Sequence, residues 1–178
     1  GNGGDYSVIN IFEVDAMDIK EIENVQNPGA MYDFFKFNQV ARFRSNEMVI
    51  EDFAKVLYTL AIDIFYNENV KMIVEYNTYG TVLFQYLRTV FPQRNDFDEE
   101  MIVRFRHRHD ARTLKPGIKL KADNKAIFCQ NFSKLYKNNR IELTDEVTVT
   151  EASLFGTLAN GSYGAQKGHD DVIMSCIT

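Results

Sequence analysis

The chain has 178 residues, of which 45% are hydrophobic and 13% aromatic, and this composition excludes a disordered protein. The length predicts a single domain, residues 1–178, that is large enough to bury a sizeable core. The net charge of −5 argues against a generally adhesive nucleic-acid binder, although a local basic face is compatible with it.

Cysteine content and hydropathy indicate the cellular compartment in which we expect the protein. The first residues, GNGGDYSV, contain no basic and apolar leader, and no apolar stretch reaches the roughly 18–20 residues that cross a membrane. Cys129 and Cys176 are far apart and outside any metal-ligand spacing, so we expect buried free thiols in a reduced compartment. The expected protein is neither secreted nor bound to a membrane.

The first part of the chain predicts strands and then a helix. Residues 6–15 are rich in β-branched and aromatic side chains and predict a mostly buried strand. The aromatic-rich residues 34–43 fit one or two further strands, and residues 45–66 predict a helix that Ser45 or Asn46 caps. The apolar face of this helix comprises Val49, Phe53, Val56, Leu57, Leu60, Ala61 and Ile64.

The second part alternates strands and helices. Residues 70–74 are too short an apolar run for a helix and predict a buried strand that ends at Glu75. The following segments predict a helix at 81–91, a strand at 101–110, a basic loop and helix at 114–139, a short strand and helix at 140–156, a hairpin or glycine-rich loop at 158–171, and a last helix. This order predicts a three-layer α/β domain with a mixed sheet, in which ligands bind at strand ends and helix N-termini.

Acidic residues stand at three places in this order. Asp5 precedes the first predicted strand and Glu75 ends a later one, while Asp170 and Asp171 open the last helix. Carboxylates gathered at one sheet edge repel one another and are tolerated mainly when a cation such as magnesium or manganese neutralises them. Two such ions can hydrolyse a phosphodiester. Residue type and spacing alone favour an ordinary N-cap, a strand-end residue and a turn residue, and the metal site stays open as the alternative.

Basic residues crowd one third of this acidic chain. Alternation places Arg104, Arg106 and Arg108 on one face of the predicted strand. Such a cluster is either a phosphate-binding surface without sequence preference or a solvated face. Its other members are Arg112, Lys115, Lys119, Lys121 and Lys125.

Four segments then carry a family resemblance: GNGGDYSVINIFEVD, MIVEYNTYG, PGIKLKADNKAIFC and GHDDVIMS. In this order they resemble the C-terminal nuclease domain of the large terminase subunit, the DNA-packaging motor of tailed bacteriophages, over nearly the whole chain. The resemblance implies an RNase H-like fold with a mixed β-sheet flanked by helices. It also implies a two-metal endonuclease that cuts concatemeric double-stranded DNA with an Asp–Glu–Asp set and Mg²⁺ or Mn²⁺.

The resemblance assigns roles to individual residues. Glu75 matches the middle acid, and Asp171 best matches the last one, with its neighbour Asp170 as the alternative ligand. Asp5 matches an auxiliary acid, and His169 stands where the family often has a histidine. The matching basic loop lies near the DNA path in the family, which implies DNA contacts by Arg108, Arg112, Lys115, Lys119, Lys121 and Lys125.

The chain departs from the family pattern at its N-terminus. The family's first catalytic Asp lies before the position of Asp5, so we expect the first metal ligand and part of the first strand to be missing. The ATPase motor domain is also expected to be absent, because no G-x-x-x-x-G-K-[ST] motif occurs. An excised fragment, a split gene, and Asp5 in the role of the first acid are the alternatives.

The resemblance further implies partners and a location. The partners are double-stranded DNA, the motor's ATPase domain, the small terminase subunit and the portal protein, in the cytoplasm of an infected host. Two other functions stay open: a non-catalytic DNA-binding or docking module with an incomplete site, and another RNase H-like nuclease, such as a junction resolvase or an exonuclease.

Overall fold

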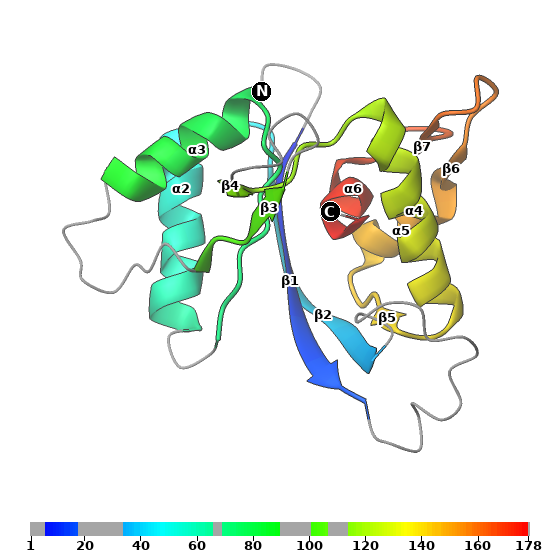
Figure 1. The fold of residues 1–178 in the computed structure, drawn as a ribbon, viewed down its shortest axis with the longest axis horizontal. Coiled ribbons are helices and arrows are strands. Elements are labelled where there is room, and N and C mark those ends of the chain that lie inside the picture. Colours follow the sequence, from blue (N-terminus) through cyan, green and yellow to red (C-terminus); the bar gives the residue numbers. More distant parts are fainter. Residues whose placement is uncertain (1–5, 18–33, 66–68, 90–100, 107–113, 178) are drawn as a thin grey trace. The chain divides into compact units, whose positions relative to one another are not determined.

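The computed structural model describes residues 6–17, 34–65, 69–89, 101–106 and 114–177. The chain divides into two compact units, each of which is described by itself (Figure 1). Unit 1 is built from residues 46–121, and unit 2 from residues 8–45 and 122–177. Unit 1 is therefore an insertion in the sequence of unit 2.

Unit 2 contains a three-stranded sheet in the order β1–β2–β5. β1 (Ser7–Ala16) is the strand expected from its β-branched and aromatic residues, and β2 (Phe35–Ser45) is one long strand. β2 pairs in parallel with β5 (Ile141–Glu142), with Phe37 opposite Ile141. A parallel pair requires a long connection between its strands, and unit 1 lies within that connection in the sequence.

Three helices of unit 2 lie on one side of β1 and β2 (Figure 1). They are α4 (Ala122–Lys137), α5 (Glu146–Leu154) and α6 (Asp171–Ile177). The antiparallel hairpin of β6 (Phe155–Thr157) and β7 (Tyr163–Ala165) precedes α6. Cys129 of α4 and Ile173 and Ile177 of α6 form a buried cluster, against which Phe128 and Phe132 pack. Burying a side chain of Ile size stabilises the fold by about 1.5–3 kcal/mol.

A buried polar network joins these layers. Gln39 of β2 is 2% exposed, and its amide donates hydrogen bonds to Asn10 Oδ1 on β1 (2.7 Å) and to Thr148 Oγ1 on α5 (3.0 Å). Its carbonyl oxygen accepts from the N–H of Thr144 (3.3 Å). Asn10 in turn donates to the carbonyl oxygen of Val172 on α6 (3.0 Å). Because buried polar groups are costly unless they are hydrogen-bonded, this network fixes the sheet against its helices.

Unit 1 contains two packed helices and a short ladder. α2 (Ile50–Tyr58) continues as the π-helix η2 (Thr59–Ile64) and packs against α3 (Thr78–Thr89). β3 (Arg104–Arg106) and β4 (Leu114–Pro116) pair antiparallel.

The predicted start of the first helix is wrong. β2 extends to Ser45, so this residue belongs to a strand, and α2 begins at Ile50 with Val49 at its N-cap and no side-chain cap. Val49 and Ile64, both expected in the core, are 62% and 58% exposed because they lie at the two ends of the helical segment. Its middle is buried as expected, at Phe53 and Ala61.

The predicted strand at residues 70–74 forms only isolated bridges. Met72 bridges Ile102, and Glu75 bridges Ile118, both in the parallel direction. Ile73 is 49% exposed, so the run is buried on one side rather than throughout.

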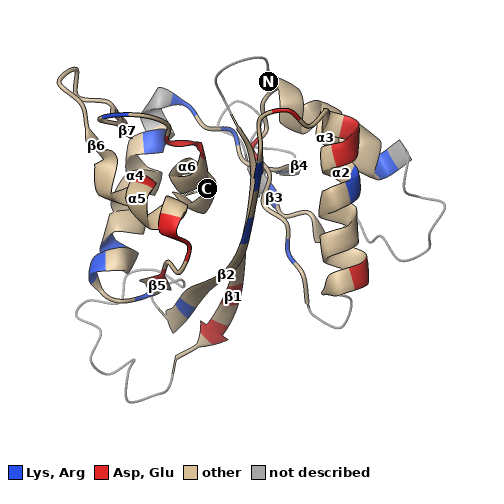
Figure 2. Cartoon of the chain, turned by 180° about the vertical axis from the view of Figure 1, so that it is seen from behind, with Lys and Arg blue, Asp and Glu red and all other residues tan. Residues whose placement is uncertain are grey.

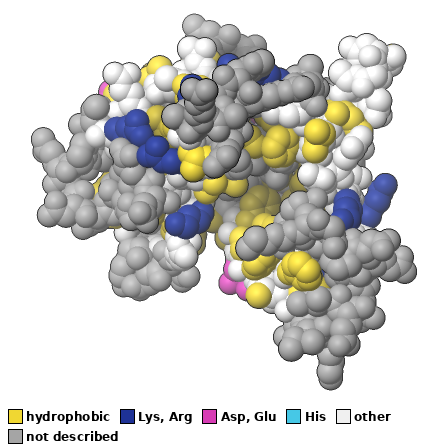
Figure 3. Space-filling view, viewed as in Figure 1, with side chains coloured by type: hydrophobic (Ala, Val, Ile, Leu, Met, Phe, Trp, Pro, Cys, Tyr) yellow, Lys and Arg dark blue, Asp and Glu magenta, His cyan; other side chains and the backbone are white. Residues whose placement is uncertain are grey.

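Large apolar side chains are also exposed on both units, and Figure 3 shows one face of this surface with hydrophobic side chains in yellow. Tyr79 of unit 1 is 70% exposed, and Ile127 of unit 2 is 57% exposed. Single exposed hydrophobic residues are normal on a protein surface.

The structure confirms a mixed α/β fold with parallel and antiparallel strand pairs and flanking helices. Within the described ranges, no helix combines the length and apolar character that crossing a membrane requires.

Candidate functional site

Glu75 lies where the apolar run of unit 1 meets the loop that precedes α4. The N–H of Tyr76 donates to the carbonyl oxygen of Ile118, and the N–H of Ile118 donates to the carbonyl oxygen of Val74 (2.8 Å). These two hydrogen bonds hold the backbone on both sides of Glu75, whose side chain is exposed.

Asn77 starts α3 two residues after Glu75. Its side-chain oxygen accepts a hydrogen bond from the N–H of Gly80 (2.8 Å), which is the contact of an N-cap residue. Its backbone carbonyl accepts from both the N–H (2.9 Å) and the hydroxyl (2.8 Å) of Thr81. The start of the helix is therefore held by hydrogen bonds two residues after Glu75.

Gly80 is the point of closest approach between α3 and the preceding run. A Cβ at this position would overlap the carbonyl oxygen of Glu75 and lie 3.1 Å from the carbonyl carbon. Gly117, on the adjoining loop, has a φ of 73° and would place a Cβ 3.0 Å from Cζ of Phe84. Two glycines thus permit the tight packing behind Glu75.

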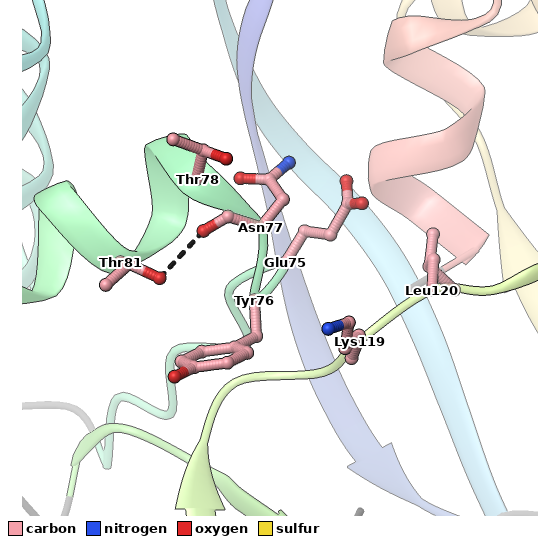
Figure 4. A pocket seen from close by; sticks show the side chains of 7 residues that line it. All are labelled: Glu75, Tyr76, Asn77, Thr78, Thr81, Lys119 and Leu120. Carbon is pink, nitrogen blue, oxygen red and sulfur yellow. Dashed lines mark hydrogen bonds between the residues drawn. The ribbon is translucent and has the colours of Figure 1, made fainter.

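A pocket of about 380 Å³ opens beside this turn (Figure 4). Two segments of unit 1 line it: the strand-to-helix turn supplies a carboxylate, and the loop before α4 supplies an ammonium group. Glu75 and Asn77 extend toward the same side, and Lys119 enters from the loop (Figure 4). The lining residues are Glu75, Tyr76, Asn77, Thr78, Thr81, Lys119 and Leu120. A carboxylate suits a cation and an ammonium group suits a phosphate.

The second group of predicted site residues lies in unit 2, at the start of α6. The side chains of Asp170 and Asp171 are 30% and 22% exposed. Asp170 Oδ2 lies 3.9 Å from Lys125 Nζ on α4, and Asp171 Oδ2 lies 3.8 Å from His169 Nδ1. Figure 2 shows acidic positions in red at the start of α6 and basic positions in blue on α4. Two carboxylates with access to water match the way Mg²⁺ is commonly held, by one or two carboxylates and several waters.

Glu151 is a functional candidate that the sequence analysis missed. It is 7% exposed on α5, and its Oε2 accepts hydrogen bonds from the N–H groups of Val172 (2.8 Å) and Ile173 (3.1 Å) on α6. Arg44 on β2 lies 3.6 Å from its Oε1. The only sequence signal was an acidic residue in the middle of a short helix, and its backbone partners lie more than twenty positions away.

Asp145 caps α5 in the way expected of an acidic N-cap. Its Oδ2 accepts from the N–H and the hydroxyl of Thr148, each at 2.8 Å, and lies 2.9 Å from Arg42 Nε. Burial acts to raise the pKa of the Asp145 carboxyl, but the hydrogen bonds from Thr148 and the Arg42 guanidinium outweigh it and hold this pKa below its ordinary value.

The two cysteines are free thiols, as expected. Cys129 is buried and Cys176 partly buried. Burial, and then the charges of Glu151 and Asp145, raise the pKa of the Cys176 thiol to about 12. Burial also raises the pKa of Cys129.

The predicted site residues therefore fall into three sets. Unit 1 holds Glu75, Lys115, Lys119 and Lys121, and brings Glu75 and Lys119 to one pocket. Unit 2 brings together Lys125, His169, Asp170 and Asp171. Asp5, Arg108 and Arg112 lie outside the described residues, as does the side chain of Arg106. Among the residues that the structure describes, no three or more His, Cys, Asp or Glu side chains form a group that could hold a metal ion.

Comparison with models of protein families found no match to the chain, and comparison with curated proteins found none either.

Proposed function

We propose that this chain is a metal-dependent endonuclease domain of the large-terminase type, with an RNase H-like fold, that cuts concatemeric double-stranded DNA during phage genome packaging. The observation that supports it best is the pocket in which the Glu75 carboxylate and the Lys119 ammonium group line one opening at a strand end. A metal-dependent nuclease needs both a cation ligand and a phosphate contact at its site.

Each predicted residue has a role in this proposal. Glu75 and Asp171 bind Mg²⁺ or Mn²⁺, and Asp170 and Asp5 support them. The bound ions supply the Lewis acidity for phosphodiester hydrolysis. Lys119 and other basic residues from the same third of the chain hold the DNA backbone through phosphates, so sequence preference is weak. They are Arg108, Arg112, Lys115, Lys121 and Lys125.

The two proposed metal ligands come from different units. Glu75 belongs to unit 1 and Asp171 to unit 2. In this proposal both residues would hold the same ions. Replacing either residue should therefore weaken the binding of the same Mn²⁺ ions. Independent binding at two separate sites would contradict a shared ion pair.

A plasmid-cutting assay with Mn²⁺ or Mg²⁺ tests the proposal. It compares the chain with a version extended at its N-terminus, each with and without Glu75→Ala. Glu47→Ala is the matched control, because Glu47 is another exposed acid of unit 1. Cutting by the extended version, its loss with Glu75→Ala and its retention with Glu47→Ala are expected.

The same assay separates the alternatives. DNA binding without metal-dependent cutting by either version would favour a non-catalytic docking module. A preference for branched or single-stranded DNA would favour a junction resolvase or an exonuclease. In the terminase interpretation, the ATPase domain, the small subunit and the portal are further partners, and none of them is needed for cutting in this assay.

A further inference from the structure

The buried carboxylate of Glu151 is the least expected charged group of unit 2. Burying a carboxylate is costly unless it is paired and hydrogen-bonded. Glu151 meets both conditions: Oε2 accepts two backbone N–H groups of α6, from Val172 and Ile173, and Oε1 lies 3.6 Å from Arg44. Its position is therefore fixed from α6 and from β2.

These hydrogen bonds replace the ordinary N-cap of α6. The residue before a helix commonly supplies the side chain that accepts from the second or third N–H group. Asp170 occupies that place, since α6 begins at Asp171. Yet the N–H groups of Val172 and Ile173 are bonded to Glu151, and the Asp170 carboxylate lies 3.9 Å from Lys125. A Cβ at Gly164 of β7 would lie 3.6 Å from Asp170 Oδ2, so this glycine leaves room for the carboxylate.

The backbone around Asp171 is held from both sides. The carbonyl oxygen of Asp170 accepts from the N–H of Met174 (2.8 Å), and the N–H of Val172 donates to Glu151 (2.8 Å). The peptide groups that flank Asp171 therefore have little freedom to rotate. The direction of its Cα–Cβ bond follows from this fixed backbone.

We propose that Glu151 is a positioning residue for the pair Asp170 and Asp171. It accepts the N–H groups of Val172 and Ile173 that Asp170, the residue before the helix, would ordinarily cap, and it acts through the backbone without touching the cation. This inference rests on the proposed function, because that function makes the pair a cation site. It adds a residue, and a physical reason why Asp170 does not accept these two N–H groups.

Two substitutions separate geometry from charge. Glu151→Asp keeps the negative charge but shortens the side chain, so it cannot reach both N–H groups. Glu151→Gln keeps the reach and one oxygen acceptor but removes the charge. Glu146→Asp is the control, because Glu146 is an exposed acid of the same helix.

The measurement is Mn²⁺ binding by the whole chain, followed through the electron paramagnetic resonance signal of the free ion. Loss of a residue that orients metal ligands typically weakens metal binding by about 10–100-fold, and we expect about tenfold for Glu151→Asp. Glu151→Gln and Glu146→Asp should retain the affinity. Without metal, amide exchange at Val172 and Ile173 should be faster in Glu151→Asp only.

The outcomes are distinguishable. Loss of affinity in Glu151→Gln but not in Glu151→Asp would overturn positioning in favour of a charge effect. Unchanged affinity in both, while Asp171→Asn weakens binding, would overturn the inference alone. The inference alone would also be overturned if Glu151→Asp weakened Mn²⁺ binding by the same factor in the Asp171→Asn background, because the effects of two coupled residues should not be additive. If Asp171→Asn itself leaves Mn²⁺ binding unchanged, the cation site of the proposed function fails, and the role of Glu151 with it.

Discussion

Replacing Gly80 by alanine should destabilise unit 1 because its new methyl group has no space. The Cβ would overlap the carbonyl oxygen of Glu75 and would lie 3.1 Å from the carbonyl carbon and 3.5 Å from Val74 Cγ1. Helix propensity favours Ala over Gly by about 1 kcal/mol, whereas overpacking costs about 1–3 kcal/mol and occasionally more. The overlap is with backbone, which cannot rotate away, so the upper value applies. The expected net loss is about 2 kcal/mol, or about 4–8 °C in melting temperature for a chain of this size.

Thermal unfolding followed by circular dichroism measures this loss. Gly156→Ala is the matched control, because a Cβ there meets only the mobile end of the Gln166 side chain, at 3.3 Å. Its melting temperature should stay close to that of the unchanged protein. If Gly80→Ala melts together with the control, the close approach of α3 to Glu75 is refuted, and with it the fixed geometry of the pocket.

Three further predictions follow from the charges and thiols. Asp145 has a pKa below its ordinary value, so its stabilising effect is present above the unfolded-state pKa of about 3.9 and is lost as the pH falls through the folded-state pKa. Asp145→Ala should cost about 1 kcal/mol in urea unfolding at pH 7 and less near pH 3; an equal loss at both pH values would contradict this. Cys176, with a pKa of about 12, and Cys129 should react slowly with a thiol reagent at pH 8 and fully in urea, and rapid native labelling would argue against their burial. Charge reversal of Lys119 and Lys121 should weaken DNA binding and flatten its dependence on salt, in a titration at several salt concentrations; unchanged binding would count against the basic loop.

Elements with a strong local signal were predictable from the sequence. The β-branched run of β1 and the amphipathic pattern of α4 need little help from distant residues, and both formed where they were expected. The start of α2 was not predictable, because the strand β2 extends over the Ser45 cap candidate. The pairing of the run before Glu75 also depends on distant partners, at Ile102 and Ile118, and no local pattern encodes how regular such a pairing is.

The residues of the candidate site also divide into those with a local sequence signal and those whose role depends on distant partners. The local context predicted a strand end at Glu75 and a helix start at Asp170–Asp171; the structure has the helix start, whereas the run before Glu75 forms only isolated bridges. Glu151 was missed because its role depends on a helix that follows about twenty residues later and on Arg44, far earlier in the chain. A buried acid whose hydrogen bonds go to another helix leaves no periodic pattern in the sequence of its own helix. Whether the acids bind metal stays a prediction.

The order in which the chain is synthesised gives the buried amide network a further consequence. Asn10 leaves the ribosome early, but its partners Val172 and Ser175 are 162 and 165 positions away. Residues 46–121 of unit 1 can fold before Asn10 on β1 has its partners, whereas unit 2 can complete its folding only when its last helix has left the ribosome. Contacts of such long range slow folding, so we expect unit 1 to become protease-resistant on nascent chains before unit 2 does. Until residues 141–142 emerge, β2 lacks its partner β5, and until α6 emerges Asn10 lacks Val172 and Ser175, so binding by a chaperone would protect the protein most in this interval.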